Sequence, residues 1–250
     1  MSRINSDLPL YNTMDNKDIA VLVLSCLMVF AVILLRSAIS GDLKSVLIFL
    51  IPFCGLLYVC RGKLNLIVKR FHKFDLGFIV LYVILYYIFA LGAGVMLYYL
   101  GVSLKPNAIL SVNKDAVFWI LFFIQIFGEE LFKLSMFFAA LSLLYRHASK
   151  IDNYIIAISV IITSLLFAAA HIFAYSSIIQ PLMILGMGNM VLMLAYIQSK
   201  NVLIPYASHI IVDFIPLMAT MFLFICWFMH DVHWFNYLNP FLYFFSFFFN

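Results

Sequence analysis

Apolar stretches long enough to cross a lipid bilayer follow one another along nearly the whole chain. About 20 consecutive apolar residues span the hydrocarbon core as a helix. The last such stretch is short and aromatic, and it can also lie along the membrane interface. We therefore expect an all-α fold, a polytopic transmembrane helix bundle of seven or eight helices. The predicted helices are 19–35, 43–59, 76–100, 116–145, 154–175, 178–197, 202–228 and 235–249.

The composition agrees with a membrane bundle and excludes a soluble domain. Hydrophobic residues make up 66% of the chain and charged residues only 10%, which is more apolar surface than a soluble fold can bury. No segment between the helices is long enough to form a soluble domain. We predict a polar cytoplasmic segment at 1–17, without a cleavable signal peptide, and one integral membrane domain at 18–250.

Basic residues indicate which ends of the helices face the cytoplasm. Since Lys and Arg gather in cytoplasmic loops, we predict that the basic segment 61–73 and the N-terminus are cytoplasmic, and that the protein is a multi-pass protein of the cell membrane. The basic residues of that segment are Arg61, Lys63, Lys69, Arg70 and Lys73. Arg146, Lys150 and Lys200 then also lie inside, whereas Arg36, Lys44, Lys105 and Lys114 lie outside.

Two further features exclude other classes of partner and cofactor site. The net charge of +4 arises at helix ends, so we predict no nucleic-acid partner and take the lipid bilayer as the surroundings. The cysteines lie in or beside apolar runs without paired spacing, so we interpret them as reduced core residues rather than disulfides or a zinc cluster. They are Cys26, Cys54, Cys60 and Cys226.

The only two glutamates of the chain, Glu129 and Glu130, are adjacent in the middle of an apolar helix. A charge at the bilayer centre costs roughly 2.5–3.5 kcal/mol, so unpaired examples are rare and usually functional. Adjacent side chains point about 100° apart on a helix, so one can face a cavity while the other takes a packing partner. Lys133 is within reach of either. Such an ion pair would neutralise one glutamate and leave the second without a partner.

Other polar side chains occur inside predicted helices. His209 and Asp213 lie on one face, where a carboxylate can fix the imidazole tautomer or share a water or metal. His171 follows the small residues 168–170, which allow a neighbouring helix to approach. Asn189 is a weaker candidate. Either histidine alone is more typical of interhelical hydrogen bonding, but one shared cavity explains the whole set.

The residue types in such a cavity are compatible with three kinds of chemistry. A glutamate can act as general base on a water that a histidine holds, with polar groups stabilising an oxyanion. Two histidines and a carboxylate can bind zinc. The same groups can relay protons in a transporter. The residues alone do not choose among these.

The order and spacing of three motifs resemble the CPBP family of intramembrane proteases. These motifs are "EELFKLS" at 129–135, "FAAAH" at 167–171 and "HIIVD" at 209–213. The family includes CAAX prenyl endopeptidases and bacterial bacteriocin-processing or self-immunity proteins, also called the Abi family. The resemblance covers about 118–214.

The resemblance implies cleavage of a peptide bond at the membrane by water activated on a glutamate. In position, Glu129 resembles the general base, His171 its water-orienting partner and Glu130 the supporting glutamate. His209 and Asp213 match positions assigned to oxyanion stabilisation or, in metalloprotease interpretations, to metal binding. The candidate metal ligands are thus His171, His209 and Glu129, with zinc as the candidate metal and no cofactor certain.

The chain departs from the family at two positions. Leu134 stands where the family usually has arginine, with Lys133 one place earlier, and a lysine cannot copy a bidentate guanidinium. Asp213 stands where CAAX endopeptidases often have asparagine, which favours a bacterial branch. We still predict an active endopeptidase acting on a membrane-associated peptide or protein. The alternatives are an inactive immunity or scaffold protein and, less favoured, a proton-coupled transporter. The sequence does not specify the oligomeric state.

The depths of the two histidines conflict with a shared cavity. By rise per residue, His171 lies roughly 25–30 Å from the cytoplasmic end of its helix and His209 only about 10–12 Å from that of its own. They cannot meet if both helices run straight and full length. Either the sixth helix does not cross fully or a predicted boundary is wrong.

Overall fold

The computed structural model describes residues 8–35, 37–104, 114–148, 152–175 and 177–228, with side chains described as far as Ala219. Within these residues the chain is all helical, without strands, and the predicted all-α membrane bundle is confirmed. Its helices are α1 (Asn16–Leu34), α2 (Gly41–Val59), α3 (Lys73–Tyr99), α4 (Ala116–Ala148), α5 (Asn153–Ala170), α6 (Ile172–Tyr175), α7 (Ile179–Ser199) and α8 (Leu203–Phe228), with a 3-10 turn at Leu64–Leu66.

The first turns of several helices are fixed by side-chain caps at the residue before the helix. Asp15 accepts a hydrogen bond from the Asp18 backbone N–H at 2.8 Å before α1, and this bond holds the pKa of the Asp15 carboxyl below its ordinary value. Asp115 caps α4 through the Phe118 N–H at 2.8 Å. Aspartate is a favoured N-cap because its oxygen satisfies a backbone donor that has no partner within the helix.

The helix predicted at 154–175 is wrong in one respect, because it is broken at His171 into α5 and α6. In a continuous helix the His171 N–H would donate to the carbonyl of Phe167. Here that N–H donates to Ala168 O at 3.0 Å. The Phe167 carbonyl is instead hydrogen-bonded to the His171 ring nitrogen Nδ1 at 2.9 Å. The side chain thus replaces a backbone bond. The helix predicted at 235–249 lies outside the described residues.

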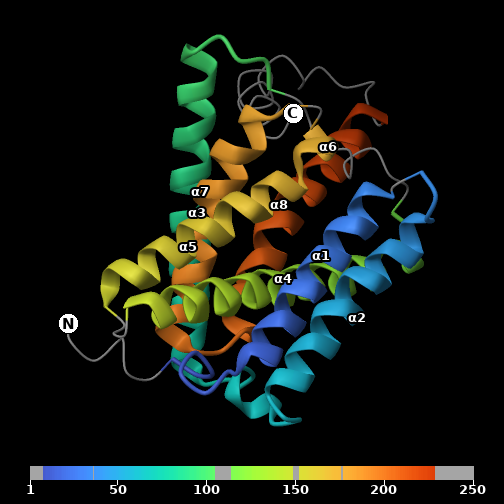
Figure 1. Ribbon diagram of the computed structural model, residues 1–250. Coiled ribbons are helices and arrows are strands. Elements are labelled where there is room, and N and C mark those ends of the chain that lie inside the picture. Colours follow the sequence, from blue (N-terminus) through green and yellow to red (C-terminus); the bar gives the residue numbers. More distant parts are fainter. Residues whose placement is uncertain (1–7, 36, 105–113, 149–151, 176, 229–250) are drawn as a thin grey trace.

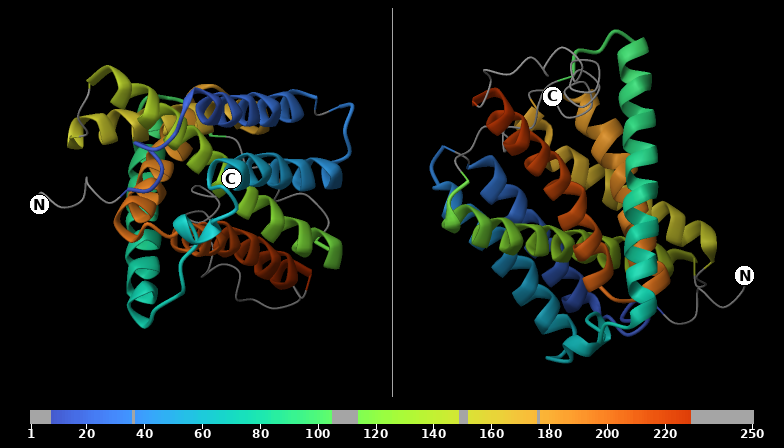
Figure 2. Two further views of the ribbon diagram at one scale, coloured as in Figure 1. Left: turned by 60° about the horizontal axis from the view of Figure 1, so that its bottom comes forward. Right: turned by 180° about the vertical axis from the view of Figure 1, so that it is seen from behind.

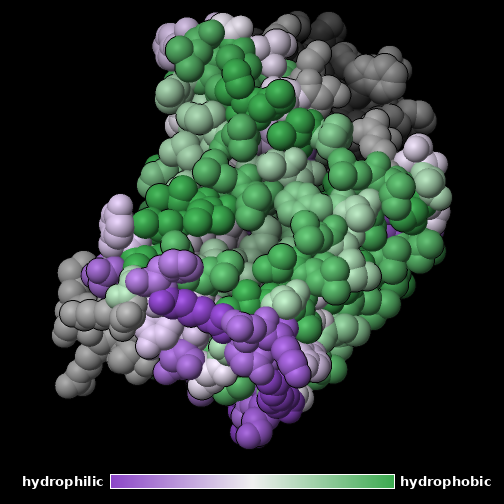
Figure 3. Space-filling view, in the orientation of Figure 1, coloured by the Kyte–Doolittle hydropathy of each residue, from purple (hydrophilic) through white to green (hydrophobic). Residues whose placement is uncertain are grey.

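Five helices are long and apolar enough to cross a membrane: α1, α2, α3, α5 and α7. The described apolar part of α8, Leu203–Ala219, is shorter. α4 carries three charged side chains near its middle and is not among the five. That α4 and α8 also cross therefore stays a prediction. In Figure 3 most of the visible face is hydrophobic, and the hydrophilic residues gather near its lower edge, where α2 leads into α3.

The helix that carries the two glutamates lies inside the bundle. α4 packs against α1, α2, α5 and α8, while α3 packs against α7 and α8. Figures 1 and 2 show that α4 runs across the direction of α3, and that α5 and α8 are inclined to α3. Enclosure by four helices leaves the middle of α4 almost entirely buried, from Glu130 to Ala139.

Backbone contact between α2 and α4 depends on Gly128. A Cβ atom at this position would lie 2.6 Å from the Cα of Phe49 and 2.8 Å from the carbonyl carbon of Ile48. Real Cβ atoms do not approach backbone this closely, so the two helices can meet here only at a glycine. The contact is one residue before Glu129 and sets the distance between α2 and the candidate site.

Gly128→Ala is expected to destabilise the bundle by about 1–3 kcal/mol, the usual cost of overpacking. The change should appear as a lower thermal unfolding temperature of the detergent-purified protein. Gly92→Ala in α3 is the matched control, because a Cβ at that position meets nothing within 4 Å. Equal unfolding temperatures for the two variants would contradict the close approach at Gly128.

Candidate active site

A cavity of about 680 Å³ is lined by residues of α2 to α8. Its lining includes four of the five candidate site residues, Glu129, His171, His209 and Asp213. The fifth, Glu130, is 3% exposed and lies behind the lining. The structure therefore brings residues from three separate motifs to one cavity.

Glu130 is the glutamate that takes the ion pair. Its Oε1 atom contacts Lys133 Nζ and lies 2.6 Å from His209 Nδ1. The Lys133 ammonium, itself fully buried, also lies 4.7 Å from the centroid of the Phe167 ring, a favourable cation–π distance. Of the two pairings within reach of Lys133, the structure has the one with Glu130. A cation therefore supports the second glutamate although Leu134 replaces the family's arginine.

Glu129 remains free of a cation among the described residues and faces the cavity. Its Oε1 atom accepts a hydrogen bond from the Gln125 amide Nε2 at 2.9 Å. The Gln125 Oε1 atom in turn accepts from the Ser45 hydroxyl on α2 at 2.8 Å. Both carboxamide atoms of Gln125 are thereby engaged, which fixes the side chain and the carboxylate it holds.

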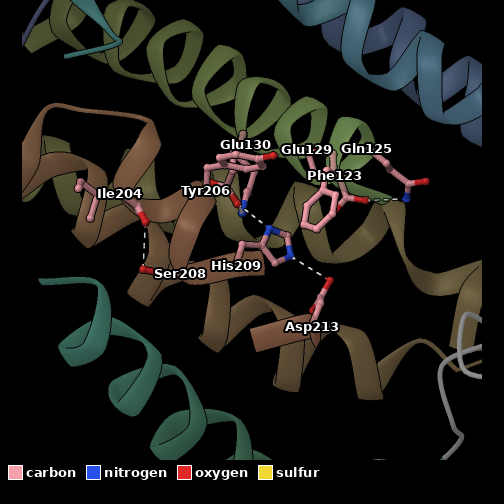
Figure 4. A network of polar contacts seen from close by, with 10 residues as sticks. Phe123, Gln125, Glu129, Glu130, Ile204, Tyr206, Ser208, His209 and Asp213 are labelled. Atoms are coloured by element: carbon pink, nitrogen blue, oxygen red, sulfur yellow. Dashed lines mark hydrogen bonds and ion pairs between the residues drawn. The ribbon is translucent and has the colours of Figure 1, made fainter. Parts of the chain in front are cut away.

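His209 lies between two carboxylates, as Figure 4 shows. Its Nδ1 atom donates to Glu130, whereas its Nε2 atom lies 3.5 Å from Asp213 Oδ2 on the next turn of α8. The first contact is a short hydrogen bond and the second is a looser ion-pair contact. An imidazole whose Nδ1 donates to a buried carboxylate presents Nε2 toward the cavity in a fixed orientation.

His171 lines the cavity, and one of its ring nitrogens is hydrogen-bonded to the backbone. A carbonyl only accepts, so the 2.9 Å contact with Phe167 O requires a proton on Nδ1 and leaves Nε2 as the acceptor in the neutral ring. Glu129 and His171 both lie close enough to Asp213 to interact with its charge. Asn189 also lines the cavity and donates through Nδ2 to Ser164 at 3.1 Å.

The two histidines line one cavity despite their unequal rise along α5 and α8. The conflict arose from treating each helix as perpendicular to the membrane. Because α5 and α8 are inclined (Figures 1 and 2) and α5 ends at Ala170, position along a helix is not depth in the bundle.

The candidate metal ligands do not form a metal centre in this geometry. Within the part of the chain that the structure describes, no three His, Cys, Asp or Glu side chains are grouped closely enough to hold a metal ion. The zinc set of Glu129, His171 and His209 therefore does not fit as the side chains stand.

The sequence did not identify two residues of the site, Gln125 and Ser45. Gln125 precedes Glu129 by four residues, so helical spacing alone could have identified it. Ser45 is 80 residues from Gln125 in sequence, and only the packing of α2 on α4 brings them together.

Comparison with known proteins places this site within a recognisable segment. Residues 112–215 match the family model described as type II CAAX prenyl endopeptidase Rce1-like. This segment resembles the Rce1-like family. It holds all three motifs, and the CPBP/CAAX protease resemblance inferred from them is confirmed over this stretch, which is less than half of the chain. No curated protein and no solved structure matches the chain. The Rce1-like match supports a protease of the membrane.

Proposed function

We propose that the protein is an intramembrane endopeptidase that hydrolyses a peptide bond of a membrane-associated peptide or protein with water activated on Glu129. One observation carries the proposal. Of two adjacent glutamates, one is neutralised by Lys133 and hydrogen-bonded to His209, whereas the other faces the cavity and is held by a neutral amide. A carboxylate that faces a cavity without a paired cation is placed to act as a general base on a water molecule.

The proposed reaction uses the groups on the cavity wall. Glu129 takes a proton from a water molecule that His171 orients through Nε2, and the oxygen of that water attacks the scissile carbonyl carbon. His209, which in this scheme carries a proton on both ring nitrogens between Glu130 and Asp213, stabilises the resulting oxyanion through its Nε2–H. The proton on Glu129 then passes to the amide nitrogen, the oxyanion re-forms the carbonyl as the C–N bond breaks, and a carboxylic acid and an amine leave.

Glu130 and Lys133 act through His209 in this scheme. Their mutual neutralisation keeps a charge pair at the buried side of the cavity, and the 2.6 Å bond to Nδ1 keeps the His209 ring in one orientation. We assign no step to a metal, because the candidate ligands are not arranged around one point.

The proposed setting is the cell membrane of a bacterium, with the N-terminus and the basic segment 61–73 in the cytoplasm. The bias of basic residues toward that end of the bundle supports this orientation. Asp213 supports a bacterial branch rather than a prenyl-protein enzyme, and a role in bacteriocin processing or immunity belongs to the same proposal.

The test compares membrane and secreted peptides, by mass spectrometry, from cells with the wild-type protein, the Glu129→Gln variant and no protein. A peptide processed only with the wild type is expected, and it would identify the substrate as well. Immunoblotting must show equal amounts of wild type and variant. If the variant processes every peptide that the wild type does, while cells without the protein differ, the chain acts as a non-catalytic scaffold instead.

A further inference from the structure

The residues that line the cavity range from buried to exposed. His209 and Asn189 are buried, Glu129 is partly exposed, and Asp42 and Asp115 are exposed. The candidate site therefore lies at the buried side of the cavity, and the lining reaches the protein surface on the opposite side.

All the exposed lining residues lie at one end of the bundle. Gly41 and Asp42 begin α2, Asp115 and Val117 lie at the start of α4, and Ala174 lies just beyond the end of α5. α2 begins at this end and runs to the basic segment 61–73 at the other (Figure 1). The surface opening of the cavity is thus separated from the basic segment by the length of α2.

The basic end of the bundle is closed below the site. The Val202 N–H donates to Ile67 O at 2.9 Å, and the Lys69 N–H donates to Asn201 Oδ1 at 3.0 Å. Ile67 and Val202 are each 1% exposed. These bonds join the segment that follows α2 to the start of α8, and neither segment contributes a residue to the cavity lining.

We propose that the cavity is entered from the end of the bundle opposite the basic segment 61–73, so that the cleaved segment of the substrate reaches Glu129 from the extracytoplasmic side. The word substrate rests on the proposed function, and the side of the membrane rests on the proposed orientation. The direction of entry rests on the lining of the cavity and on the closed basic end. The substrate is then a peptide or protein segment exposed at the outer face of the membrane.

Cysteine labelling in intact cells tests the route without depending on catalysis. The reagent is a small, charged, membrane-impermeant methanethiosulfonate, and labelling is counted above that of the unsubstituted protein. Gly41→Cys reports on the opening, where an added Cβ meets nothing within 4 Å. Gln125→Cys reports on the cavity interior, with Leu121→Cys on the same lining as a second variant. Lys63→Cys, at an exposed position of the basic segment, is the control.

Labelling of Gly41→Cys and Gln125→Cys is expected to be the same in intact and permeabilised cells, and Lys63→Cys should be labelled only after permeabilisation. Protection of Gln125→Cys and Leu121→Cys in intact cells, with labelling after permeabilisation, would overturn the proposal and indicate cytoplasmic entry. Their protection under both conditions would also overturn it, because the cavity would then be closed. If the expected labelling is found but no peptide is processed, the entry route stands and the proposed protease function fails.

Discussion

Replacing Glu129 by glutamine is expected to lower the rate of substrate cleavage by roughly 10²–10⁴-fold, the usual contribution of a general base. Glutamine keeps the size of the side chain and can still hydrogen-bond to Gln125, but it cannot accept the proton from water. The measurement is the turnover of the identified substrate by purified protein in detergent or vesicles, together with the thermal unfolding temperature of each variant.

Gln125→Leu separates proton transfer from positioning. It removes the amide that donates to Glu129 at 2.9 Å and breaks the link to Ser45, yet it leaves the carboxylate in place. A smaller loss of turnover than in Glu129→Gln is therefore expected. Turnover of Glu129→Gln at the wild-type rate, with the protein folded, would remove Glu129 from the mechanism.

The helices could be predicted from the sequence because the length of each apolar stretch determines where a helix can cross the bilayer. A stretch of apolar residues in a bilayer must satisfy its backbone groups internally, so predicted and observed helices agree closely from α1 to α4. The break of the helix at His171 could not be predicted from the apolar stretches. It depends on the ring nitrogen of His171 binding the Phe167 carbonyl, a local contact that leaves hydropathy unchanged.

The polar residues of the site could be identified from the sequence because a polar side chain costs free energy in a membrane. The side chains that they contact could not be identified in this way. Lys133 is four residues from Glu129 and three from Glu130, and both spacings allow contact on a helix. The choice of Glu130 depends on His209 and Phe167, which come from α8 and α5. Spacing within α4 therefore allowed Lys133 to pair with either glutamate, and the packing of α8 and α5 against α4 determines that it pairs with Glu130.

The contact between Ser45 and Gln125 shows the same limit more clearly. Neither residue is charged, and each is unremarkable in its own helix. Only the close approach of α2 and α4 at Gly128, where no side chain separates the backbones, brings the serine within reach of the amide. The orientation of a candidate catalytic carboxylate thus depends on a glycine and a serine that have no part in the chemistry.

Lys133→Met is expected to have the largest effect on stability. Methionine fills much of the same volume but leaves the Glu130 carboxylate, 3% exposed, without its cation. Removing one partner of a buried ion pair typically costs about 3–5 kcal/mol of stability. We expect a loss at the low end of this range, about 3 kcal/mol, because His209 still contacts Glu130. The fall should appear as a lower thermal unfolding temperature in detergent.

The double variant Glu130→Gln/Lys133→Met is the decisive control. It removes both charges and keeps a side chain that can accept a hydrogen bond from His209, so most of the lost stability is expected to return. Its turnover is expected to stay below that of the wild type, because a neutral amide holds the imidazole of His209 less firmly than a carboxylate does. If Lys133→Met alone is as stable as the double variant, Glu130 does not depend on the lysine. Lys133 would then have no structural role in the site.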